Sequence, residues 1–237
     1  MNSTIIAFLL ALIPGFAWLI YFLRKDVLPE PKRKILKVFL AGMVVCVPVL
    51  LFEIWLLNDL KNIELEYKLF LILKCIFVVG LIEEMFKYLT VRITVLKTSS
   101  IDEPIDIPLY MIVAALGFAT IENIILFYNQ RVLLLDSPFV LVFSRFLGAT
   151  LLHVISSGII GYFLAQSFYY LRQRRILLVF GFILGVVIHA TFNFFLESSI
   201  IKETGSMFPS FALVLIIFLL FSFCLRKIKK LKSVCKL

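Results

Sequence analysis

Residues 35–57 read ILKVFLAGMVVCVPVLLFEIWLL, an almost unbroken apolar run. At a helical rise of about 1.5 Å per residue, this run exceeds the roughly 20 residues needed to cross the hydrocarbon core of a bilayer. The whole chain has the same character, because 62% of its 237 residues are hydrophobic and 25 are Phe. Ordinary soluble domains contain about 45–50% apolar residues. The composition therefore predicts a polytopic membrane protein.

Seven runs are long and apolar enough to span a membrane. They lack the alternating pattern of barrel strands, and only helices and closed barrels satisfy the backbone in lipid, so we expect an all-α helical bundle. The expected spans are residues 4–23, 35–57, 69–96, 109–128, 139–170, 176–196 and 208–225. The loops between them are too short for a second domain. We therefore expect one transmembrane domain, 1–225, and a basic cytoplasmic tail, 226–237.

Lysine and arginine predict the orientation. Most of them lie in or beside the loops after the first, third and fifth expected spans, and in the tail. By the positive-inside rule, the N-terminus is outside and the C-terminus is cytoplasmic. The net charge of +9 is thus explained by topology and anionic lipid, and no nucleic-acid partner is expected. The predicted location is the cell membrane, with several spans.

Ionisable side chains occur at similar depth in four expected spans. Such a group costs roughly 2.5–3.5 kcal/mol at membrane depth, so it needs a packed, polar or wet interior. Counted from the predicted cytoplasmic ends, the groups lie roughly 18–26 Å along their helices. They can therefore meet in one layer. The residues are Glu83, Glu84, Glu122, His153 and His189.

Helical spacing relates these groups to their neighbours. Lys87 follows Glu83 and Glu84 by four and three residues, so it can pair with either acid. Adjacent residues point about 100° apart on a helix, so the two acids face different directions. Asn193 follows His189 by four residues and shares its face.

Each of these side chains could also have a purely structural role. An intramembrane His or Asn is commonly an interhelical hydrogen bonder, and a Glu–Lys pair can serve only to stabilise insertion. The two histidines of the chain, however, share one expected layer with three carboxylates. This concurrence favours a functional site.

The motifs resemble those of the PrsW family of intramembrane proteases. They are Glu-Glu-x-x-Lys at 83–87, Phe-x-x-x-Glu-Asn at 118–123, a helical His at 153 and His-x-x-x-Asn at 189–193. The segment from Pro14 to Pro31 is also similar to the opening of that family. Each motif alone is weak, but their combination in this order is specific.

Related CAAX-type and bacteriocin-processing membrane proteases share part of this pattern. They usually have His where this chain has Glu122, and Arg after the double Glu where this chain has Lys87. Both departures favour the PrsW family. The resemblance implies an endopeptidase of the bacterial plasma membrane that cuts single-pass membrane proteins. In the family's known case, an anti-sigma factor is cut at its extracytoplasmic side, as the first step of regulated proteolysis.

A carboxylate mechanism is one chemical interpretation. Several carboxylates in one cavity share protons rather than all ionising, so one can act as base and later as acid. Glu83 is the leading base and Glu84 the next candidate, while Glu122 and His153 would hold the water. His189 and Asn193 would donate hydrogen bonds to the oxyanion, as is implied for the matching positions of the related proteases. Lys87 and Asn123 are expected to be supporting residues.

A metal site is the competing interpretation. His153, His189 and Glu122 could supply three zinc ligands, with Glu83 as base, although no His-Glu-x-x-His motif demands zinc. A serine nucleophile at Ser156 or Ser157 is disfavoured, because no orienting acid is evident.

Two other classes of function stay open at this point. A proton-coupled transporter would use a similar Glu and His relay, but would usually show interrupted or duplicated helices. A non-catalytic membrane scaffold related to these proteases need not retain every catalytic group. The expected partners are the lipid bilayer and a single-pass membrane substrate, and the oligomeric state is left open.

Overall fold

The described part of the chain is helical and contains no strand. A computed structural model describes residues 3–24, 29–98, 101, 103–129 and 138–201, together with isolated positions between 212 and 226. The helices are α1 (Ser3–Leu23), α2 (Lys32–Lys61), α3 (Tyr67–Leu73), the π-helix η1 (Lys74–Leu81), α4 (Ile82–Thr94), α5 (Asp106–Asn129), α6 (Pro138–Leu147), α7 (Ala149–Tyr169), the 3₁₀-helix η3 (Leu171–Gln173) and α8 (Arg174–Ile201). The prediction of an all-α membrane bundle is confirmed.

Within these residues, five helical segments are long and apolar enough to cross a membrane. They are Ile5–Leu23, Lys32–Lys61, Asp106–Asn129, Pro138–Tyr169 and Leu171–Ser198. The expected span at 208–225 and the tail at 226–237 lie almost entirely outside the described residues. The count of seven, the orientation of the termini and the division into domain and tail stay predictions.

Two expected helices are interrupted. The span expected at 69–96 consists of α3, η1 and α4 in succession, so it contains a π-helical segment that ends immediately before Ile82. The span expected at 139–170 breaks at Gly148, whose ψ of −105° lies outside the helical region. A long apolar run predicts that a segment is helical, but not where its hydrogen-bond register changes.

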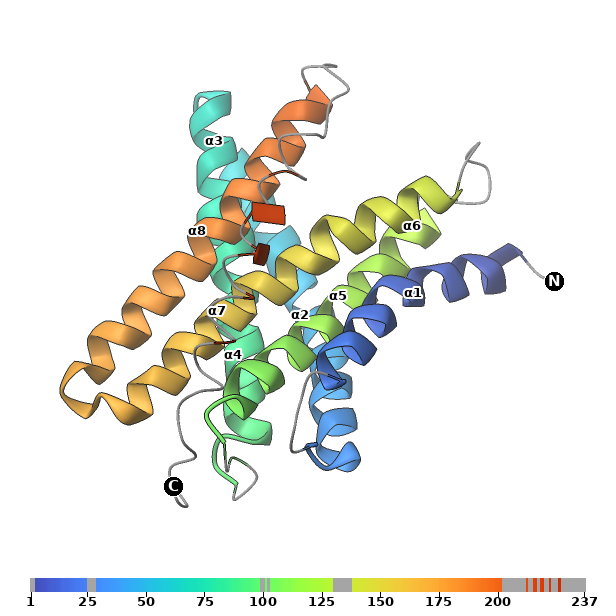
Figure 1. The fold of residues 1–237 in the computed structure, drawn as a ribbon. Helices are drawn as coiled ribbons and strands as arrows, with labels where there is room; N and C mark the ends of the chain where they lie inside the picture. Colours follow the sequence, from blue (N-terminus) through green and yellow to red (C-terminus); the bar gives the residue numbers. More distant parts are fainter. Residues whose placement is uncertain are drawn as a thin grey trace.

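Helix α5 is the centre of the bundle. It packs against α1, α2, α4 and α7, while α7 also packs against α8. Figure 1 shows this order, with α5 and α7 between α1 on one side and α8 on the other. Most side chains of α5 from Asp106 to Thr120 are buried. A helix that is apolar on every side needs such a central position.

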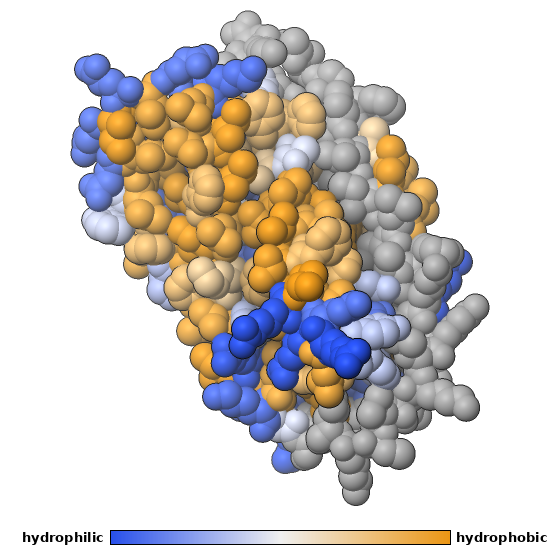
Figure 2. Space-filling model, turned by 90° about the vertical axis from the view of Figure 1, so that its left-hand side faces the viewer, coloured by the Kyte–Doolittle hydropathy of each residue, from blue (hydrophilic) through white to orange (hydrophobic). Residues whose placement is uncertain are grey.

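Large apolar side chains also cover the outer surface. Val44, Leu51 and Ile54 of α2 each expose more than half of their surface. Figure 2 shows one broad hydrophobic face, with hydrophilic residues gathered mainly toward its upper and lower ends. A continuous apolar face of this kind suits contact with lipid and would be unusual on a soluble monomer.

Small residues bring α2 and α5 into backbone contact. A Cβ atom at Gly42 would collide with the carbonyl oxygen of Ala114, and one at Gly117 would collide with that of Phe39. Small residues at helix crossings allow this approach, which is a common way to pack helices in membranes. The α2–α5 crossing fixes the position of both helices relative to the site.

We predict that Gly117→Ala destabilises the protein by about 1–3 kcal/mol, because the added methyl group forces α2 and α5 apart. The free energy of unfolding in detergent micelles measures the effect. Val44→Ala, at an exposed position of α2, is the control and should change stability much less. Equal stability of the two variants would contradict the close crossing.

Candidate active site

Four helices bring ionisable side chains together inside the bundle. Helix α4 carries three of them, and α5, α7 and α8 carry one each. Five of the six side chains are at most 3% exposed, and the sixth, that of Glu122, is 18% exposed. The group, called the polar layer below, consists of Glu83, Glu84, Lys87, Glu122, His153 and His189.

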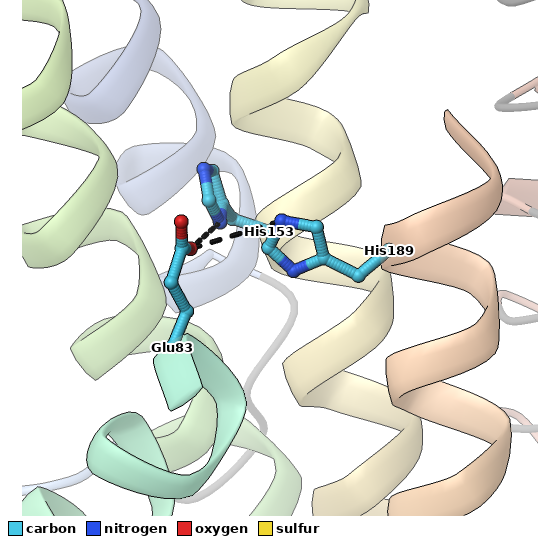
Figure 3. Close-up of side chains that lie close together, drawn as sticks. All are labelled: Glu83, His153 and His189. Atoms are coloured by element: carbon cyan, nitrogen blue, oxygen red, sulfur yellow. Dashed lines mark ion pairs between the residues drawn. The ribbon is translucent and has the colours of Figure 1, made fainter. Parts of the chain in front are cut away.

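Glu83 faces both histidines (Figure 3). Its Oε2 atom lies 3.6 Å from Nδ1 of His153 and 3.7 Å from Nε2 of His189. The two imidazole rings are nearly perpendicular, with centroids 5.0 Å apart. One ligand atom from each of the three residues lies within 4.8 Å of the others. Among the described residues, this trio has the spacing of a metal-binding group.

Glu84 points in a different direction and braces neighbouring helices. Its Oε1 accepts a hydrogen bond from Ser156 at 2.9 Å, and its Oε2 accepts one from Ser157 at 2.6 Å. Nδ1 of His189 also lies 2.9 Å from Oε1. Both serine hydroxyls therefore serve a carboxylate of another helix, which disfavours a serine nucleophile. Their role was missed because sequence does not show which helix they face.

The carboxylates determine the histidine tautomers. An ionised carboxylate can only accept a hydrogen bond, so the ring nitrogen beside it carries the proton. Nε2 of His153 lies 2.7 Å from Oε2 of Glu122, and Nδ1 of His189 lies beside Glu84. Each histidine turns its other ring nitrogen, Nδ1 of His153 and Nε2 of His189, toward Glu83.

Lys87 is the buried cation of the polar layer. Its Nζ lies 3.0 Å from Oε2 of Glu83, 2.9 Å from Oε1 of Glu84 and 2.8 Å from Nδ1 of His153. The ammonium group also lies 4.6 Å from the centre of the Phe118 ring. All three ammonium hydrogens thus have acceptors.

Arg145 extends the polar layer from α6. Its Nη2 donates to Oε2 of Glu122 at 3.4 Å, and its Nε donates to Oδ1 of Asn123 at 2.5 Å. Asn123 donates in turn to Thr150 at 3.2 Å. Sequence reasoning did not assign Arg145 a role, although an arginine inside an apolar segment is itself a signal.

The structure gives Asn193 and Glu122 contacts that differ from those expected from sequence. Asn193 makes no side-chain hydrogen bond to any described residue, although it lies one turn from His189 on α8. Glu122, named as a third metal ligand, instead holds the far nitrogen of His153, and Glu83 completes the trio with metal-ligand spacing. Shared depth placed the residues correctly in one layer, but it did not determine which atoms face each other.

The family follows from comparison with known proteins. Residues 30–223 match the family described as "PrsW family intramembrane metalloprotease", which is most of the chain. The chain belongs to the PrsW family. It is therefore an intramembrane protease, and the prediction of this family and enzyme class is confirmed.

Curated relatives agree with this assignment. The chain is 28% identical over 223 residues to Protease PrsW of Bacillus subtilis, with 93% of each protein covered. It is 26% identical to Protease PrsW of Oceanobacillus iheyensis, covering 85% of this chain and 84% of that protein. No solved structure matches the chain significantly. The family and its bacterial relatives identify a multi-pass cell-membrane protein.

We predict that Lys87→Met lowers the free energy of unfolding by about 3–5 kcal/mol, because it leaves buried carboxylates without their cation. Lys74→Met is the matched control. Lys74 pairs with Glu197 at 2.6 Å, but these side chains are 24% and 32% exposed, so the expected loss is only about 0–1 kcal/mol. Chemical unfolding in micelles measures both, and similar losses would contradict the central role of Lys87.

Proposed function

We propose that this PrsW-family protease hydrolyses a peptide bond of a single-pass membrane protein at the trio of Glu83, His153 and His189, with a bound divalent metal ion. One observation carries the proposal. Each histidine is held by a carboxylate at one ring nitrogen and turns the other nitrogen toward Glu83. Carboxylates that orient metal-binding histidines in this way are a general feature of metal sites.

The trio fits a zinc-like ion. Two His and one Glu form a known ligand set of catalytic zinc, and ligands of a tetrahedral ion with bonds of about 2.0–2.1 Å lie roughly 3.3 Å apart. The distances from Glu83 to the two histidine nitrogens, 3.6 and 3.7 Å, are close to this value. The family's description as a metalloprotease is consistent with this interpretation.

Lys87 supports the alternative mechanism, in which Glu83 is a general base without a metal. The ammonium lies within hydrogen-bonding distance of Oε2 of Glu83 and Nδ1 of His153, which are two of the three proposed ligand atoms. A metal ion and the ammonium would compete for these atoms. The two mechanisms therefore differ in which cation the trio holds during catalysis.

The remaining residues supply proton transfer and alignment. A divalent ion bound at the trio would act as a Lewis acid toward the scissile carbonyl. Glu122 is the most exposed carboxylate of the polar layer, and we assign it the transfer of a proton from water to the leaving amine. Glu84 is fully buried and occupied by hydrogen bonds, so it orients His189 instead.

The position of the polar layer supports a proposal for the substrate class. It lies inside a bundle with apolar outer faces, so a substrate reaches it most directly from the lipid. We propose a membrane-anchored regulator, such as an anti-sigma factor, cut at its extracytoplasmic side. The family assignment favours this function over a transporter or a scaffold.

We predict that Glu83→Gln and His153→Asn each abolish the cleavage of one or a few single-pass proteins. N-terminal proteomics of membrane and shed fractions measures this, with equal protein levels verified. Both substitutions remove a proposed metal ligand, and in the alternative mechanism the loss of Glu83 as general base should still lower the rate ~10²–10⁴-fold. Glu66→Gln, at an exposed position between α2 and α3, is the control and should cleave as the wild type does. Unchanged termini in all variants would overturn the proposed function.

We predict that the purified protein binds one divalent ion and that His189→Asn removes it. Glu122→Gln should weaken metal affinity by about 10–100-fold, because His153 loses its orienting carboxylate. Metal analysis by mass spectrometry and titration with a chelator measure both effects. Ser167→Ala, which removes a buried hydroxyl elsewhere on α7, is the control. Full cleavage activity after complete metal removal would favour Glu83 as a general base.

A further inference from the structure

A buried carboxyl group on α2 takes no part in the mechanism above. Glu53 is only 6% exposed, and its Oε1 atom is buried with no hydrogen-bond partner among the described residues. Buried polar atoms are almost always hydrogen-bonded, because an unsatisfied one costs free energy. The structure thus contains a polar atom whose partner must come from outside the described residues.

Glu53 lies beside the polar layer. Val49, one helical turn before it, packs in one cluster with Ile82 of α4, which immediately precedes Glu83. Glu53 is also close enough to the polar layer for electrostatic interaction with Glu83, Glu122 and Lys87. Helix α2 packs against both α4 and η1, so Glu53 is buried on the helix that borders the α4 end of the polar layer.

A peptide group is a fitting partner for this carboxyl. In its protonated form, a carboxyl offers one O–H donor and one carbonyl acceptor, which match the C=O and N–H of a peptide unit. A membrane-spanning substrate must open its helix before a peptide bond can be attacked. The exposed peptide groups then need new partners, because lipid offers none.

We infer that Glu53 is a substrate-binding residue that hydrogen-bonds a peptide group of the opened substrate next to the scissile bond. The inference rests on the proposed function, since it requires a peptide substrate in the polar layer. A purely structural role fits poorly, because a buried carboxyl oxygen without a hydrogen-bond partner among the described residues does not stabilise the fold. If Glu53 did not bind substrate, replacing it with Leu would stabilise the fold and leave cleavage unchanged.

Two variants test the inference. Glu53→Gln keeps one donor group and one acceptor, whereas Glu53→Leu keeps the approximate size and removes both. In the full-length protein in its native membrane, N-terminal proteomics first identifies the cleaved span. A synthetic peptide of that span is then the probe for kinetics in micelles, with each rate normalised to the folded fraction.

The expected result for Glu53→Leu is a kcat/KM lowered by ~10-fold, mainly through a higher KM, because a binding interaction is lost. Glu53→Gln should stay within about 3-fold of the wild type. Glu53→Met is the second apolar variant if the Leu protein does not fold, and it should behave in the same way. Glu83→Gln is the inactive reference.

Three results would overturn the inference. An unchanged kcat/KM in the apolar variants means that Glu53 does not bind substrate. An equal loss in Glu53→Gln means that a proton, rather than a hydrogen-bonding pair, is required. Absence of any termini that depend on the wild-type protein overturns the proposed function as well, which separates that failure from a failure at Glu53 alone.

Discussion

The buried ammonium group of Lys87 is the contact on which the polar layer depends. It neutralises carboxylates that could not otherwise be buried together, and it also reaches His153 of α7. A charge buried in the bundle is tolerated only when it is paired and hydrogen-bonded, and three acceptors surround this one. Because its partners come from two helices, the same contact joins α4 to α7 and sets the position of Glu83.

Close helix packing then holds the other groups at matching depth. The glycine contacts between α2 and α5 leave little freedom to slide, and α5 carries Glu122 to His153. The π-helical segment η1 directly precedes Ile82, and π-helical turns frequently occur at functional sites. The geometry of the site is therefore a property of the whole bundle, since no single helix contains more than half of the polar layer.

Much of the fold could be predicted, because lipid leaves few alternatives for an apolar chain. The helices and most of their boundaries follow from apolar runs, and helices cover most of six expected spans. The π-helix and the break at Gly148 could not be predicted. They depend on packing against other helices, such as the contact of Gly80 with the backbone of Val186 on α8.

By itself, the sequence determined the class of the protein, its family and the residues that share one layer, because hydropathy, spacing and motifs are local properties of the chain. Only the tertiary structure decided how these residues are paired. Glu83 faces both histidines, Glu84 accepts hydrogen bonds from two serines, and Arg145 pairs with Glu122, whereas Asn193 makes no side-chain hydrogen bond to a described residue. The reason is physical: depth along a helix follows from counting residues, but the direction of a side chain relative to another helix depends on helix rotation and crossing angle, which packing alone fixes.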